Sequence, residues 1–269
     1  MRRNRIVTVT VIAASAALLA LAGCSSQSGS SDGGDADGPA ALADGTLVVA
    51  TEGTYRPFSY HEDGDGELTG YDVEVARAVA DKLGVEVTFE ETQWDAIFAG
   101  LDAGRFETIA NQVSITDERE EKYVFSTPYT VSPGVIVVPE DDDSITSFDD
   151  LEGKTTAQSL TSNWYELAQE SGATVEPVEG WAQAVTLIEQ GRVDATINDE
   201  LTFLDYEVEQ GDTGLKIAAE TEEAGESAFV FTSENEDLAE AISGALDELR
   251  EEGVLADLGE QFFGEDVSQ

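Results

Sequence analysis

The chain of 269 residues carries 57 acidic side chains against 13 lysines and arginines, which gives a formal net charge of −44 at pH 7. This excess excludes nucleic acid as a partner by repulsion, and because the acids are spread along every segment it favours a hydrated surface suited to a salty environment over a cation site. The single cysteine and single histidine exclude an internal disulfide and a histidine-rich metal site, so we expect no metal and no cofactor.

Residues 1–23 have the pattern of a secretory signal peptide, with a basic start followed by an uncharged apolar run over 6–22. The run ends in Leu-Ala-Gly-Cys, which resembles the lipobox of bacterial lipoproteins and implies that Cys24 is acylated and anchors the chain to the membrane. The alternative is an uncleaved anchor, since the run is near the lower limit of membrane-spanning length. Residues 24–45, rich in Ser, Gly, Asp and Ala, are expected to form a flexible tether.

Strands and helices alternate in the first half of the folded chain. The pattern predicts strands over 47–50, 85–89 and 105–110 and helices over 70–83 and 93–104. Such alternation is typical of a right-handed parallel unit, in which ligands collect at the carboxyl ends of the strands. Tyr55 follows the first strand, and Trp94 lies in the first turn of the second helix. For Tyr55, a ring stacked over a ligand and a rim aromatic that covers the core remain equally open.

The segment 111–119, Asn-Gln-Val-Ser-Ile-Thr-Asp-Glu-Arg, follows the third of these strands. Arg119 is one of only ten basic residues that remain once the three arginines of the signal peptide are removed, and Ser114 and Thr116 lie just before it. A guanidinium beside small polar groups can present two parallel donors to a carboxylate, so the segment predicts an anion clamp. The alternative is that Arg119 pairs with a neighbouring acid at a solvated helix start, for which Thr116 is the N-cap.

The same alternation returns in the second half of the chain. The pattern predicts strands over 122–129, 134–138, 156–160, 175–178, 194–197, 216–219 and 227–231 and helices over 164–170, 181–190 and 238–252. Ser162 and Asn163 precede the first of these helices, where free N–H groups and the helix dipole favour an anion. An ordinary N-cap without a ligand is the alternative.

Asp199 follows an apolar strand, where a carboxylate has few ways to be solvated. A buried acid needs a cationic partner or several donors, so this residue is a candidate for binding a ligand ammonium group. Its alternative is an N-cap for the helix that begins near Leu201.

Two alternating halves predict a two-lobed α/β fold with a cleft at the hinge, each lobe a mostly parallel sheet flanked by helices. We expect lobe 1 over 46–132 and 227–264 and lobe 2 over 133–226, joined by two hinge strands. Arg119 with the amides of Ser162 and Asn163 would hold a carboxylate, and Asp199 would hold an ammonium. The predicted cleft therefore suits a zwitterion, and an α-amino acid meets that requirement.

Five motifs resemble the extracellular solute-binding proteins of polar amino-acid ABC transporters, solute-binding family 3. They lie at 51–58, 70–76, 111–119, 123–129 and 198–199 within a resemblance that runs from about Thr46 to Phe263. The resemblance implies a periplasmic-binding-protein-like type II fold in which Tyr55 and Trp94 flank the ligand side chain. It implies that the Gln112 carbonyl accepts a hydrogen bond from the ligand ammonium and that Asp199 pairs with the same group. It also implies that the ligand carboxylate is bound by Ser114, Arg119, Ser162 and Asn163.

Within that family, the segments 111–112, 158–164 and 179–181 look most like the cystine-binding branch. Glu52 stands where receptors for histidine and lysine often have an acid, so a basic ligand stays possible. With the lipobox at its N-terminus and nothing in the sequence that suggests a permanent interface, we expect a monomeric, lipid-anchored receptor on the extracytoplasmic face of the membrane. It would close its lobes around an amino acid and deliver it to an ABC permease.

Two other functions remain open on sequence alone. One is an enzyme similar to the periplasmic dehydratases of this fold, although the only histidine, His61, lies in an acidic turn that is expected to be exposed, away from a cleft. The other is a sensor that reports its ligand state to a membrane kinase.

Overall fold

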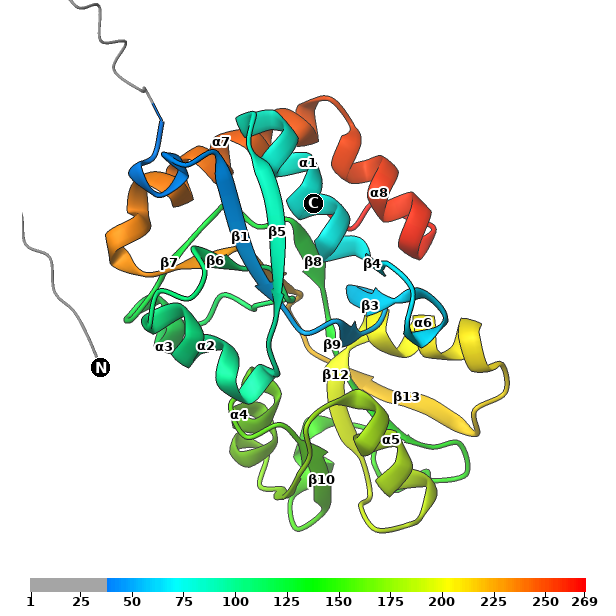
Figure 1. Cartoon of the computed structure of the whole chain (residues 1–269). Helices are drawn as coiled ribbons and strands as arrows, with labels where there is room; N and C mark the ends of the chain where they lie inside the picture. Colours follow the sequence, from blue (N-terminus) through cyan, green and yellow to red (C-terminus); the bar gives the residue numbers. More distant parts are fainter. Residues whose placement is uncertain (1–37) are drawn as a thin grey trace, which may run out of the picture. The chain divides into compact units, whose positions relative to one another are not determined.

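The computed structural model describes residues 38–269 (Figure 1). The predicted signal peptide, Cys24 and residues 25–37 of the predicted tether lie outside the described residues. The end of the predicted tether is ordered, because Ala40–Leu42 form a short 3-10 helix, η1, whose first N–H donates to the Asp237 carboxylate at 3.2 Å. No helix in the described part of the chain is long and apolar enough to cross a membrane.

A five-stranded mixed sheet forms the centre of the first lobe. Its strands, in spatial order, are β5 (Glu86–Glu91), β1 (Thr46–Thr51), β6 (Thr108–Ile109), β15 (Val230–Phe231) and β7 (Val124–Phe125). Strand β1 is parallel to β5 and β6, as predicted, whereas β15 is antiparallel to its two neighbours.

Helices pack on both faces of this sheet because β1 alternates its buried side chains between them. Leu47 and Val49 join a cluster with α1 (Tyr71–Leu83), α7 (Glu236–Glu251) and α8 (Val254–Phe263). Ala50 joins the opposite cluster with α2 (Trp94–Asp102), near the short α3 (Asp117–Glu120) (Figure 1). A strand buried on both faces is typical of a parallel α/β core.

The first lobe also contains a small antiparallel sheet. It consists of β2 (Thr54–Tyr55), β3 (Ser59–His61) and β4 (Leu68–Thr69). The acidic segment between β3 and β4 holds one 3-10 turn, η2 (Glu62–Gly64), so the predicted turn is confirmed.

The second lobe is built around three antiparallel strands, β12 (Thr196–Asp199), β9 (Gly134–Pro139) and β13 (Leu215–Glu220). A parallel pair, β10 (Thr155–Gln158) and β11 (Thr174–Pro177), continues it through a bridge between Thr156 and Ala195. The pairing of β9 differs from the mostly parallel sheet that the sequence predicted. Strand β9 enters this lobe directly from the first lobe without an intervening helix, so it runs opposite to its neighbours.

Three helices and two short 3-10 turns complete the chain. They are α4 (Asn163–Glu170), α5 (Trp181–Glu189), α6 (Glu200–Gln210), η3 (Phe148–Leu151) and η4 (Ser233–Asn235). Between the lobes, β8 (Thr130–Ser132) pairs antiparallel with β14 (Gly225–Ser227), which gives the two-strand hinge. The C-terminal segment lies against this hinge, because the Val131 N–H donates to the Val267 carbonyl at 2.7 Å.

Candidate functional site

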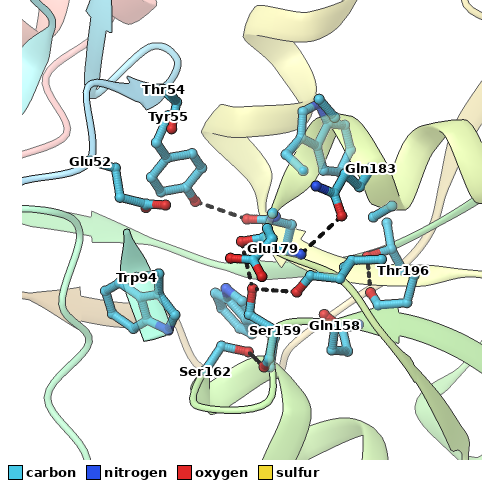
Figure 2. Close-up of a pocket in the computed structure, with 18 of the residues that line it drawn as sticks. Glu52, Thr54, Tyr55, Trp94, Gln158, Ser159, Ser162, Glu179, Gln183 and Thr196 are labelled. Carbon is cyan, nitrogen blue, oxygen red and sulfur yellow. Dashed lines mark hydrogen bonds between the residues drawn. The ribbon is translucent and has the colours of Figure 1, made fainter. Parts of the chain in front are cut away.

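A cavity of about 340 Å³ lies between the carboxyl ends of the first-lobe strands and the loops of the second lobe. Figure 2 shows Glu52, Tyr55 and Trp94 on one side of it and Ser159, Ser162 and Glu179 on the other. The volume falls at the lower end of the range of about 300–1,000 Å³ that is usual for small-molecule sites. The site therefore suits a small solute that contacts both lobes.

The first-lobe wall follows from the topology of the sheet. Strands β1 and β6 are parallel neighbours, so the residues after their last positions, Glu52 and Asn111, meet at one edge. Asn111 Oδ1 accepts from the Glu52 N–H at 2.8 Å, and its Nδ2 donates to Glu52 Oε2 at 2.7 Å. Burial raises the pKa of the Glu52 carboxyl to about 7, which the hydrogen bond from Asn111 partly opposes.

Tyr55 lines the cavity and also joins the two lobes. Its hydroxyl donates to Asn198 Oδ1 at 2.9 Å and accepts from Thr202 Oγ1 at 3.0 Å, and both partners lie in the second lobe. Burial raises the pKa of this hydroxyl well above its ordinary value, so it stays protonated and able to donate.

Arg119 lies beside the cavity without being part of its wall. Its guanidinium lies 5.5 Å from the ring centroid of Trp94 and 5.4 Å from that of Phe98, and it donates to the backbone carbonyls of Ser114 at 2.8 Å and Thr161 at 3.5 Å. Desolvation lowers its pKa to about 10, so it remains charged at neutral pH.

Among the described residues, Arg119 is the one arginine without an ion pair. The other five arginines of residues 38–269 each contact a carboxylate within 3.5 Å. The predicted alternative, pairing with an adjacent acid, is therefore not seen. The Thr116 hydroxyl accepts from the Arg119 N–H at 3.3 Å, which agrees with the predicted N-cap of α3.

On the second lobe, Ser162 is the N-cap of α4, where its hydroxyl accepts from the Tyr165 N–H at 3.1 Å. Both Ser162 and Asn163 line the cavity, so the first turn of this eight-residue helix points toward it. Ser162 is therefore the N-cap that the sequence left as an alternative, and it also lines the cavity.

Asp199 is buried at the end of β12 and does not line the cavity, whereas its neighbour Asn198 does. The Asp199 Oδ1 atom accepts from the Ser132 hydroxyl at 2.8 Å and from the Leu201 N–H at 2.9 Å, which makes it the N-cap of α6. Burial raises its pKa to about 6. Both hydrogen bonds end on Oδ1, and Oδ2 accepts none from the described residues. The ammonium role of Asp199 stays a prediction.

The structure thus brings five of the eight predicted ligand-binding residues to one cavity: Tyr55, Trp94, Gln112, Ser162 and Asn163. Ser114, Arg119 and Asp199 lie outside it. Sequence reasoning did not assign Gln158, Glu179, Trp181 and Gln183 to the site, yet they line it. Figure 2 shows Gln158, Glu179 and Gln183 at the cavity. Gln158 ends β10 and Glu179 follows β11 closely, so the rule of the carboxyl ends that identified Tyr55 would also have found these two.

Three donors around the cavity have no hydrogen-bond partner among the described residues, although they are buried. They are Trp94 Nε1, Gln158 Nε2 and Trp181 Nε1. Unpaired buried donors are rare in proteins, so their grouping favours a polar ligand that carries acceptor atoms. No group of acidic, histidine or cysteine side chains in the described part of the chain is arranged to hold a metal ion.

Comparison with known proteins agrees with this geometry. Residues 47–265 match the family described as bacterial extracellular solute-binding proteins, family 3. The chain belongs to this family. Over 225 residues it is 50% identical to the L-cystine-binding protein TcyA of Bacillus subtilis (strain 168), a match that covers 84% of either chain. The family and this name support a solute receptor rather than an enzyme, as the sequence predicted.

Two solved structures that are similar to this chain bear on the arrangement of the lobes. The L-cystine solute receptor of Neisseria gonorrhoeae, unliganded and open, is 51% identical and has a TM-score of 0.59, with 84% of this chain and 96% of that one covered. An ancestral arginine-binding protein bound to arginine is only 34% identical but has a TM-score of 0.76, with 82% and 99% covered. Despite the lower identity, the present arrangement is more similar to the ligand-bound structure, in keeping with the hydrogen bonds between the lobes.

Proposed function

We propose that this chain is the lipid-anchored, extracytoplasmic receptor of an ABC importer, and that it captures a polar amino acid, with L-cystine favoured, by closing its lobes around it. The family supplies the general role of solute receptor. The ligand class is inferred from the charged groups at the cavity, above all from Arg119.

Arg119 is the observation that carries the proposal. Although the chain has 57 acidic residues, Arg119 forms no ion pair within the described residues, whereas each of the other described arginines does. Its guanidinium lies against two aromatic rings and donates only to backbone carbonyls. Removing a cation from water is unfavourable unless it gains a partner. A ligand carboxylate next to Trp94 would supply that partner, and the N–H groups at the start of α4 would bind its other oxygen.

Two acceptors at or near the cavity, the Gln112 carbonyl and the Asp199 carboxylate, suit an ammonium group. The Gln112 carbonyl accepts no hydrogen bond from the described residues, and Gln112 lines the cavity. Asp199 Oδ2 accepts no hydrogen bond from residues 38–269, so in our proposal this oxygen binds the ammonium once the ligand is present. Cation and acceptors together make the site complementary to a zwitterion.

L-cystine is favoured over other amino acids because the relatives named above are cystine-binding proteins at 50% and 51% identity. The cavity also extends to Glu179 and Gln183, which offers polar groups to a ligand with a second polar end. Glu52 at the wall leaves a basic amino acid as the competing ligand.

The direct test is a thermal-shift screen of the twenty amino acids and L-cystine in high salt, followed by calorimetry with each hit. The protein would start at Ser25, so that the signal peptide and Cys24 are absent. We expect Arg119→Met to weaken binding of the hit at least tenfold, which corresponds to about 1.4 kcal/mol.

Arg105→Met is the matched control, because Arg105 lies on the same lobe, is about half exposed, and pairs with Glu90 at 2.9 Å. We expect it to bind as the wild type does. Equal affinity in Arg119→Met and in the wild type would refute the assignment of the carboxylate site.

The membrane attachment and the domain limits are part of the same proposal. We propose cleavage after residue 23, acylation of Cys24, lobe 1 over 46–132 and 227–264, lobe 2 over 133–226, and a monomer in solution. Expression of the full chain should place it in the detergent phase of a Triton X-114 partition, and Cys24→Ser should move it to the aqueous phase. Light scattering of the protein that starts at Ser25 would test the monomer.

A further inference from the structure

Asp72 is a fully buried carboxylate that contacts Gln112 in the binding segment, residues 111–119. It is the second residue of α1, and both of its oxygens accept hydrogen bonds from Gln112. Oδ2 accepts from the Gln112 N–H at 2.7 Å, and Oδ1 accepts from Gln112 Nε2 at 2.6 Å. Asp72 has no ion-pair partner among the described residues, so its burial is balanced by these donors rather than by a cation.

Gln112 has an unusual backbone conformation. Its φ is +49°, and only one other non-glycine residue in the described part of the chain, Asp63, has a positive φ. The left-handed region is unfavourable for a residue with a side chain and persists where surrounding contacts hold it. Here the two hydrogen bonds to Asp72 hold the residue at both its backbone and its side chain.

These bonds also determine which polar group of Gln112 remains free. Its N–H is bound to Asp72, and its Nε2 is bound to Asp72 and to Thr130 Oγ1 at 3.0 Å. Its Oε1 is buried and has no hydrogen-bond partner within the described part of the chain, so the side-chain amide is oriented by the bonds that its Nε2 donates. The backbone carbonyl is the acceptor left at the cavity wall.

We propose that Asp72 is a positioning residue for the ligand amino group: it holds Gln112 in the left-handed conformation and thereby keeps the Gln112 carbonyl directed at the ligand ammonium. This inference rests on the proposed function, because it requires an amino-acid ligand. It adds a residue that does not touch the ligand and that lies on another element, α1.

The experiment uses L-cystine as the probe, with calorimetry at pH 8 on the protein that starts at Ser25. Asp72→Ala removes both acceptors and should weaken L-cystine binding at least tenfold. Asp72→Asn keeps the shape and one acceptor, so it is the variant safest for folding, and we expect a loss of about threefold. A cooperative thermal transition establishes that each variant is folded.

A second substitution separates positioning from a merely structural tie between α1 and the binding segment. Glycine adopts the left-handed region readily, so Gln112→Gly no longer needs Asp72 to hold the backbone. In the background of Asp72→Ala, or of Asp72→Asn if the alanine variant does not fold, Gln112→Gly should restore most of the lost affinity. Gln112→Ala in the same background is the matched control and should restore none.

The outcomes distinguish this inference from the proposed function. If the wild type fails to bind L-cystine, the proposed function fails first. If the wild type binds and a folded Asp72→Ala binds equally well, the positioning role is overturned. The role is also overturned if Gln112→Gly and Gln112→Ala give the same affinity in the Asp72 variant. A structural tie between the side chains of residues 72 and 112 would be lost in both double variants, so glycine would then restore no more affinity than alanine.

Discussion

Replacing Tyr55 with phenylalanine would remove one hydroxyl and leave the aromatic ring at the cavity wall. That hydroxyl makes two hydrogen bonds to the second lobe, to Asn198 at 2.9 Å and from Thr202 at 3.0 Å. Neutral hydrogen bonds contribute about 0.5–1.5 kcal/mol each. Asn198 Oδ1 also accepts from the Asp199 N–H at 2.8 Å, so it keeps a partner, and the loss should be about 1–2 kcal/mol rather than the upper limit.

These two bonds join the lobes, so they contribute to the closed form and not to an open one. Their loss raises the free energy of the closed form alone, and a ligand that is captured by closure then binds more weakly by the same free energy. At tenfold per 1.4 kcal/mol, we expect about a 5- to 30-fold loss of affinity for L-cystine in Tyr55→Phe.

Calorimetry would measure the affinity, and small-angle scattering with and without ligand would measure closure. Tyr60→Phe is the matched control, because Tyr60 lies in the same small sheet and its hydroxyl makes no hydrogen bond with the described residues. Unchanged affinity in Tyr55→Phe, with the same scattering profile as the wild type, would refute the idea that this hydroxyl stabilises closure.

Three further predictions concern charged groups. Arg56 contacts Asp205 at 3.4 Å and Glu209 at 3.0 Å across the lobes, so Arg56→Gln should weaken L-cystine binding by about two- to fivefold in low salt and have no effect in 1 M KCl; a loss that persists in high salt would contradict an ionic contact. Asp199→Ala should weaken L-cystine binding at least tenfold. Asparagine is also a good N-cap, so an Asp199→Asn variant that binds as tightly as the wild type would show that Asp199 acts only as the cap of α6 and not on the ligand ammonium. Burial raises the pKa of the Asp72 carboxyl from 3.8 to about 7, so the folded state binds the carboxyl proton more tightly than the unfolded state does. The stability that this proton contributes is fully present below about pH 4 and is lost as the pH rises through 7. The fall in unfolding free energy between pH 5 and pH 8, from urea denaturation, should therefore be smaller in Asp72→Asn by about 2–3 kcal/mol, and an equal fall in both proteins would contradict the shift.

The parts of this site that could be predicted follow from local rules. Apolar periodicity located β1, α1 and α2 to within one or two residues. The rule that ligands collect at the carboxyl ends of parallel strands placed Tyr55, Trp94, Ser114 and Arg119 along one edge, and of these Tyr55 and Trp94 line the cavity. Ser162 as an N-cap was predictable because the signal lies within three residues of chain.

The contacts that could not be predicted join residues far apart in sequence. Asn111 holds Glu52 across 59 positions, and Asp72 holds Gln112 across 40. Neither pair leaves a local pattern, since an Asn after a strand and an Asp at a helix start each have common structural uses. The antiparallel pairing of β9 was missed for a related reason, because the direction of a strand depends on how the chain enters the lobe and not on the strand's own residues.

The acid excess at first argues against a site for a carboxylate, because a negative surface repels an anion before it arrives. The position of Arg119 answers this objection. Glu118 and Glu166 attract the Arg119 guanidinium electrostatically but do not form an ion pair with it. Trp94 and Phe98 cover the guanidinium, which is therefore poorly solvated. A charge pair formed there would be screened far less by salt than the surface charges are. High salt would therefore remove most of the repulsion between the surface acids and an approaching carboxylate, while the attraction to Arg119 would persist. In a salty environment this acidic receptor should thus retain the amino-acid binding that it would lose if the carboxylate were bound by an arginine on the surface.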